Sequence, residues 1–132
     1  MRVTADTNVL IRAVVRDEPE QAAMAIALLR GASAIVVTMA CLCEFVWVLE
    51  KVYGFDRDAI ASAIRVLTAA ENVQVESESC EPALGVFEAG GDFADGVIAA
   101  EGHSLGAETF VSFDERAVKA LSATGIPARL LT

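Results

Sequence analysis

Four aspartates occupy positions from which carboxylates could do chemistry together. They stand where predicted strands end or predicted helices begin: Asp6, Asp92, Asp95 and Asp114. The first directly follows an apolar run at 2–5, and the last comes shortly after a predicted strand at 109–111. Asp92 and Asp95 are three residues apart at the start of a predicted helix, so both face the same side. Carboxylates that converge in this way repel each other unless a cation neutralises them.

Glu44 is a fifth acid of interest because of its neighbours on the helix predicted at about 39–53. At about 100° per residue, the side chains around it are all apolar: Ala40, Cys41, Trp47 and Val48. This spacing predicts that the carboxylate projects from the buried side of the helix. Because a buried carboxylate without a partner is costly, we expect Glu44 to meet either an Arg from elsewhere or a cation shared with other acids.

Each acid also has a purely structural interpretation. Three of the aspartates suit the start of a helix, as N-caps or as a first-turn acid that favours the helix dipole: Asp6, Asp92 and Asp95. Ser112 and Glu115 have the spacing of a capping box, which would account for the segment that contains Asp114. Glu44 could form an ordinary buried ion pair. A shared cation is the one interpretation that unites all five acids.

Oxygen is the only ligand type that these acids offer. The single histidine, His103, is interpreted as non-catalytic, and the three cysteines lack the spacing of metal ligands, so a structural zinc site is not expected. Carboxylates alone suit Mg²⁺ or Mn²⁺. Mg²⁺ held by carboxylates keeps several waters and binds substrate phosphate, so the pattern indicates phosphodiester hydrolysis.

Strands and helices are predicted to alternate along the chain. The predicted strands are at 2–5, 34–37, 73–75, 109–111 and 126–130. The predicted helices are at about 6–14, 17–30, 39–53, 56–70, 81–89, 92–105 and 113–123. This alternation predicts an α/β fold in which a parallel sheet is covered by helices on both faces. Sites in such sheets form at the carboxyl ends of the strands.

Length and composition restrict the class of protein. A chain of 132 residues corresponds to one domain, and 55 % hydrophobic residues exclude a disordered chain. The net charge is −9, so tight non-specific clamping of a nucleic-acid backbone is not expected. We expect no membrane span, because charged residues interrupt the most apolar segment. An acid at the sixth position argues against a signal peptide, so a reducing, cytoplasmic setting is expected.

These residues together resemble a known family. The resemblance lies in the Asp-Thr-Asn-Val-Leu segment at 6–10, Glu44, the Asp-Phe-Ala-Asp-Gly-Val-Ile-Ala segment at 92–99 and Ser-Phe-Asp at 112–114. In order and spacing they resemble the PIN domain, and more closely the VapC-type toxin ribonucleases of bacterial toxin–antitoxin pairs. The resemblance covers essentially the whole chain, which implies a single PIN domain over 1–132.

The resemblance implies a fold and a site. The fold is a three-layer α/β arrangement with a central, mostly parallel sheet flanked by helices on both faces. The implied catalytic metal ligands are Asp6, Glu44, Asp95 and Asp114, and Asp92 matches a frequent extra acid. Thr7, Asn8 and Ser112 match polar residues that orient the site. Gly96 stands where the family usually has Ala, and we expect it to loosen the helix slightly.

The resemblance also implies an activity and partners. The activity is a Mg²⁺- or Mn²⁺-dependent endoribonuclease, with transfer RNA as the expected substrate. The partners are a VapB-type antitoxin and a second copy of the chain, which assemble into a larger complex. We expect the antitoxin to reach the acids with an Arg or Lys. Arg12, Arg16 and Lys51 are candidates for RNA phosphate contacts, although each could equally be an ordinary surface charge.

Two other functions fit parts of the pattern. A receiver-like signalling domain also carries acids at strand ends, but it needs a phosphoacceptor Asp after its third strand and a Lys after its fifth. Here Glu76 follows the third predicted strand, and neither Lys51 nor Lys119 follows a strand. A catalytically silent PIN-fold interaction module would be marked by a missing acid, and none is missing.

Overall fold

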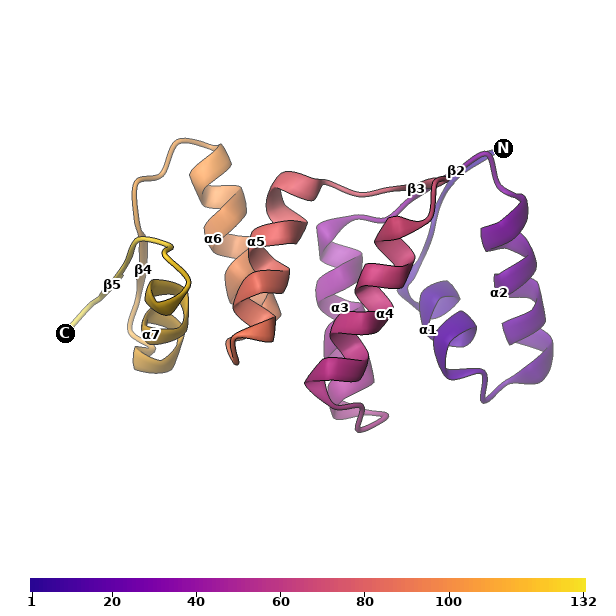
Figure 1. Cartoon of the computed structure of the whole chain (residues 1–132), viewed down its shortest axis with the longest axis horizontal. Helices are drawn as coiled ribbons and strands as arrows, with labels where there is room; N and C mark the ends of the chain where they lie inside the picture. The colour runs from indigo at the N-terminus through magenta and orange to yellow at the C-terminus, as the bar shows by residue number, and fades with distance from the viewer. The chain divides into compact units, whose positions relative to one another are not determined.

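The computed structural model describes residues 1–132 as two compact units, residues 1–75 and 76–132. The first unit contains β1 (Arg2–Thr4), α1 (Thr7–Val15), α2 (Pro19–Gly31), β2 (Ala34–Val36), α3 (Met39–Lys51), α4 (Arg57–Ala69) and β3 (Val73–Gln74) (Figure 1). The second contains α5 (Ser77–Glu88), α6 (Phe93–Ser104), β4 (Phe110–Ser112), α7 (Glu115–Ala123) and β5 (Ala128–Leu130). A single domain over 1–132 stays a prediction. No helix of the chain has the length and apolarity needed to cross a membrane.

The strands form two parallel sheets, one in each unit. In the first unit the order is β1-β2-β3, with Val3 opposite Ile35 and Ile35 opposite Val73. In the second unit β4 pairs with β5, with Val111 opposite Arg129. The prediction of a mixed α/β chain with parallel strands is therefore confirmed. Parallel pairing brings the carboxyl ends of paired strands to the same sheet edge.

The core of the first unit combines the sheet with one side of α3. Ile35 in the middle of β2 is fully buried, as are Leu42, Phe45 and Leu49 along α3. Residues three and four apart on a helix share a face, so these α3 side chains form one buried stripe. The Thr38 hydroxyl accepts a hydrogen bond from the Cys41 amide (3.1 Å) and caps the helix.

An ion pair with two further polar partners ties the end of α1 to the segment after α3. Arg12 donates from Nη1 to Asp17 (3.1 Å) and to the Tyr53 hydroxyl (3.3 Å), and from Nε to Gln21 (2.8 Å). Tyr53 in turn donates to Asp17 (3.1 Å). The helix predicted at about 17–30 is present, but Asp17 does not cap it, because its carboxylate binds these side chains instead. Helix α2 begins at Pro19, and its flanking residue Glu18 makes no capping bond.

Two helices of the second unit begin away from their predicted positions. Helix α5 begins at Ser77 rather than 81, so Pro82 lies inside the helix and not in its first turn. A proline there removes one backbone hydrogen bond near the helix start. Helix α5 packs closely against α6. Helix α7 begins at Glu115 rather than 113, because the Asp114 carboxylate is its cap.

Close packing of α5 against α6 depends on Gly96. A Cβ at position 96 would lie 2.8 Å from the Ala83 Cα and 3.3 Å from its carbonyl oxygen. The two helices lie side by side (Figure 1), and Phe87 meets Phe93 edge to face with ring centroids 6.3 Å apart. The missing side chain at Gly96 therefore permits the close helix contact. This role adds to the slight loosening of the helix expected from the sequence, which stays a prediction.

Gly96→Ala should destabilise the protein by about 1–3 kcal/mol, because the new methyl group overlaps backbone atoms of Ala83. Gly85→Ala is the matched control: it changes an exposed glycine inside α5, and its Cβ would have nothing within 4 Å. This control should stabilise the protein by roughly 0.5–1 kcal/mol through helix propensity. Urea unfolding of both variants measures the difference, and equal effects would contradict the packing role of Gly96.

Candidate functional site

Asp6 stands at the start of α1 with its carboxylate unused by the helix. It is the residue before the helix and has the extended backbone of an N-cap, yet its side chain accepts no capping hydrogen bond. The Asp6 side chain is exposed, directly after β1, where the Ala5 amide still donates to Val36 (3.1 Å). The N-cap interpretation therefore accounts for its position but not for its carboxylate, which is available to a ligand.

Glu44 lies on the exposed side of α3, so the prediction of a buried carboxylate was wrong. Its neighbour Trp47 is also exposed, and the buried stripe of the helix lies elsewhere, around Phe45 and Leu49. The error has a physical reason: α3 is apolar almost all round, so apolar neighbours do not mark its buried side. Water therefore solvates the Glu44 carboxylate, and no Arg pairs with it.

Asp6 and Glu44 line one pocket of about 380 Å³ in the first unit. Its other lining residues are Thr4, Ala5, Thr7, Thr38, Ala40 and Cys41. The buried Thr7 hydroxyl donates to the Cys41 sulfur (3.6 Å), which fixes the start of α1 against α3. Thr7 therefore lies beside both acids, and its role in orienting the site stays a prediction. Asn8 is exposed and does not line the pocket.

The Cys41 thiol lies near both carboxylates, because the charges of Asp6 and Glu44 both affect its pKa. Burial raises the pKa of this thiol, the hydrogen bond from Thr7 opposes the rise, and the negative charges of Asp6 and Glu44 raise it further. Two carboxylates from β1–α1 and from α3 thus share the region around one sulfur. This position of Cys41 has no signal in the amino-acid sequence, because a free cysteine is ordinarily a small, buried apolar residue.

Asp92 and Asp114 are tied to the first turns of two helices in the second unit. Asp92 accepts from the Asp95 amide (3.0 Å) and caps α6, as predicted. Asp114 accepts from the Arg116 and Ala117 amides (2.9 and 3.3 Å) and caps α7. The capping-box interpretation of Ser112 and Glu115 was therefore wrong. The Ser112 hydroxyl instead accepts from the Asp114 amide (2.9 Å) and orients that residue.

The negative charges of Asp92 and Asp114 both affect the Asp95 carboxyl. Burial raises the pKa of the Asp95 carboxyl above its ordinary value, and the negative charges of Asp92 and Asp114 raise it further. Since the folded pKa lies above the unfolded one, the stability that this group contributes at low pH is lost as the pH rises through the folded pKa. At neutral pH the three carboxylates therefore repel one another, and a cation nearby would relieve that repulsion.

The donor atoms of both groups suit a hard divalent cation, although neither group is a complete metal site. Every candidate ligand is a carboxylate, the ligand that Mg²⁺ and Mn²⁺ prefer. No group of three or more His, Cys, Asp or Glu side chains in the structure is close enough together to hold a metal ion. The first unit supplies Asp6 and Glu44, and the second supplies the three aspartates around Asp95.

The predicted RNA-binding cations are mostly engaged with the protein itself. The Arg12 guanidinium has three partners, as described above, and the Lys51 ammonium lies 3.6 Å from Glu50. Arg16 is exposed and donates to the Ala13 carbonyl (3.2 Å). None of the three lines the pocket that holds Asp6 and Glu44. Their contact with RNA phosphate stays a prediction.

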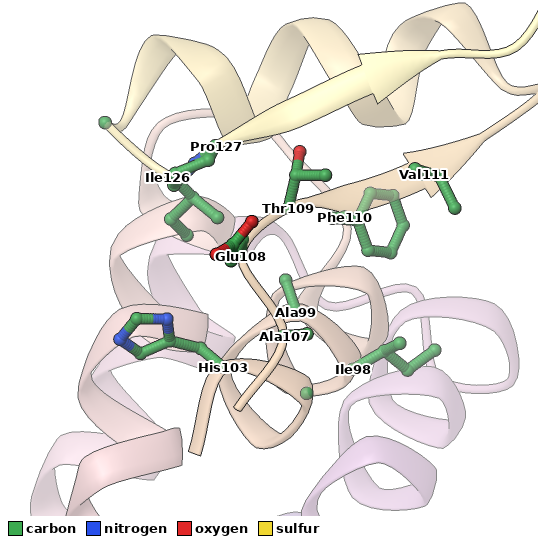
Figure 2. Close-up of a pocket in the computed structure, with 12 residues that line it drawn as sticks. Ile98, Ala99, His103, Ala107, Glu108, Thr109, Phe110, Val111, Ile126 and Pro127 are labelled. Atoms are coloured by element: carbon green, nitrogen blue, oxygen red, sulfur yellow. The ribbon is translucent and has the colours of Figure 1, made fainter. Parts of the chain in front are cut away.

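A larger pocket in the second unit does not contain the acids. It has a volume of about 480 Å³ and lies against α6, β4 and the segment before β5 (Figure 2). Ile98, Phe110 and Ile126 give it an apolar lining, and His103 and Glu108 are its titratable side chains. It offers no carboxylate pair and no set of metal ligands. This pocket therefore lacks the carboxylate ligands that the sequence predicts for the site.

A carboxylate that caps a helix and one that makes no capping bond should differ in their effect on the free energy of unfolding. Asp114→Ala should cost about 1 kcal/mol, because it removes the cap of α7. Asp6→Ala should change the free energy of unfolding by less than roughly 0.5 kcal/mol, because its side chain makes no capping bond. Asp114→Asn is the control, since asparagine also caps helices. Urea unfolding measures all three, and a large loss for Asp6→Ala would contradict its free carboxylate.

Comparison with known proteins adds the family. A family model described as the PIN domain matches residues 3–122, which is most of the chain and includes all five acids. A search of curated proteins finds no match to the chain.

Proposed function

The chain belongs to the PIN domain family, and from that premise we propose that it is a metal-dependent endoribonuclease. The family supports a nuclease, and the carboxylates support dependence on Mg²⁺ or Mn²⁺. The observation that carries the proposal is the free Asp6 carboxylate, which lines a pocket together with Glu44. Asp6 stands at the N-cap of α1, yet its carboxylate accepts no capping hydrogen bond. We propose as metal ligands Asp6, Glu44, Asp95 and Asp114, with Asp92 as an additional acid.

The chain's own residues hold and orient the reacting groups. A bound divalent cation would polarise the scissile phosphate and lower the pKa of an attacking water. Asp92 and Asp114 are held by backbone amides, so their carboxylates keep a fixed direction. Thr7 and Ser112 orient the segments that carry Asp6 and Asp114. A catalytically silent module remains the alternative, and the presence of all five acids argues against it.

Neutralising one acid in each unit tests the proposal. Asp6→Asn and Asp95→Asn should each reduce RNA cleavage roughly a hundredfold or more, the scale of losing one preorganised electrostatic group. Cleavage by the unaltered chain should require Mg²⁺ or Mn²⁺ and stop with EDTA. Glu101→Gln is the matched control, because Glu101 is an exposed acid of α6 outside both carboxylate groups and should leave cleavage unchanged.

Thermal unfolding supplies a readout that does not depend on activity. Mg²⁺ should raise the Tm of the unaltered protein and of Glu101→Gln, because a ligand that binds the folded state stabilises it. It should raise the Tm of Asp6→Asn and Asp95→Asn less. Metal-independent cleavage, or full cleavage by both aspartate variants, would refute the proposal.

We further propose that the nuclease is a toxin that a cognate VapB-type antitoxin inhibits, with transfer RNA as its substrate and a homodimer as its working form. The toxin role follows from the resemblance of the motif segments. Partner binding is supported by large apolar side chains exposed on α2, α3 and α4, among them Met24 (72 %), Trp47 (58 %) and Val66 (75 %). An antitoxin Arg or Lys would be attracted to the carboxylates, and Arg could hold two of them at once.

Expression in bacteria without an antitoxin tests the toxin role. The unaltered chain should arrest growth, and sequencing of RNA ends should show new cleavage sites in transfer RNA. Asp6→Asn, expressed to the same level, should permit growth, because it lacks one proposed metal ligand. Equal growth of both strains while purified protein still cleaves RNA would exclude the toxin role and leave the nuclease intact.

A further inference from the structure

Phe113 is a large apolar side chain that the proposed mechanism does not use. It lies between Ser112 and Asp114, of which Asp114 belongs to the second carboxylate group and Ser112 orients it, and 82 % of its surface is exposed. We propose that the Phe113 ring stacks on a nucleobase of the bound RNA beside the cleaved bond. This inference rests on the proposed nuclease function. It adds a residue that binds the RNA by stacking on a base and not by contacting its charged phosphates.

A structural role does not account for Phe113. It is the residue before the Asp114 cap of α7, where an apolar side chain often packs on the residue four positions past the cap, here Val118. Such a staple would bury much of the ring. The ring instead keeps 82 % of its surface in water, so the staple is not formed. Phe113 also does not line the apolar pocket beside β4.

The ring is exposed but its backbone is held on both sides. Ser112 pairs with Leu130 at the end of β4, and its hydroxyl accepts from the Asp114 amide (2.9 Å). Asp114 is fixed in turn by the amides of Arg116 and Ala117. Phe113 is thus the single residue between a strand and a helix cap. A side chain with only two rotatable bonds, attached to a backbone that is held in place, loses little conformational entropy when a flat ligand stacks on it.

The surroundings favour a nucleobase over a protein partner. The residues that follow Phe113 are charged and exposed: Asp114, Glu115 and Arg116. A protein hot spot needs a ring of contacts that exclude water, and charged neighbours of this kind do not provide one. Stacking needs only one free ring face, and every base has a π-face to offer. The Arg116 guanidinium is in no ion pair, and it would suit the adjoining phosphate.

Steady-state cleavage of a single-stranded RNA with the mapped cleavage site tests the inference. Phe113→Ala should raise KM roughly tenfold, within the range known for loss of one base–aromatic stack. Phe113→Trp should keep KM near the original value, and Phe113→Leu should behave like Phe113→Ala, because leucine keeps apolar area but has no ring. Leu105→Ala is the matched control, since Leu105 is a 90 % exposed apolar residue of the same unit and should leave KM unchanged.

RNAs with one abasic nucleotide identify the stacked base. For the unaltered enzyme, one abasic position should raise KM by about the same factor as Phe113→Ala. The two changes together should then cost no more than either alone, the non-additivity expected of direct partners. Equal urea midpoints for Phe113→Ala and the unaltered chain check that the fold is intact.

The outcomes separate this inference from the function on which it rests. Cleavage by the unaltered enzyme with an unchanged KM for Phe113→Ala would overturn the stacking role alone. A changed molar mass of Phe113→Ala in light scattering, with KM unchanged, would overturn it in favour of a protein contact. Failure of the unaltered enzyme to cleave or bind any RNA would overturn the proposed function and this inference together.

Discussion

Repulsion between carboxylates is the constraint on which the candidate site depends. Each unit keeps acids of like charge close to one another, and each uses a different means to tolerate this. In the second unit the backbone amides at the starts of α6 and α7 hold Asp92 and Asp114, and the helix dipoles favour their charge. Asp95 responds through a raised pKa. In the first unit Asp6 and Glu44 remain open to water, which screens their charges.

Carboxylates held close together destabilise the folded protein through their repulsion. A protein with no chemistry at these acids would have no reason to keep them together. If these acids served only as helix caps, each helix start would carry one acid and no further acid would lie close to it. Here Asp95 adds a third charge beside two caps, and Asp6 is exempt from capping although it stands at a helix start. Local stability does not require either feature. Both are features that the proposed binding of a divalent cation by oxygen ligands would use.

Much of the local structure was predictable because its causes are local. Asp92 caps its helix as expected, since capping depends on a few consecutive residues. The exposed side of α3 was not predictable, because a helix that is apolar all round has no pattern to read. The start of α5 at Ser77 was missed, because Pro82 lies inside the helix, where proline is unfavourable. The position of Cys41 near Asp6 and Glu44 depends on tertiary contacts that no spacing encodes.

The contacts of Arg12 have a consequence for how fast a polyanion can reach this protein. Three polar partners hold that guanidinium, and Glu50 lies beside Lys51, so few cations near α1 and α3 project freely. With a net charge of −9, a nucleic acid then diffuses toward a repelling surface. Dissolved salt shortens the reach of that repulsion. The encounter rate with RNA should thus rise with ionic strength at low salt, the reverse of the trend for basic RNA-binding proteins.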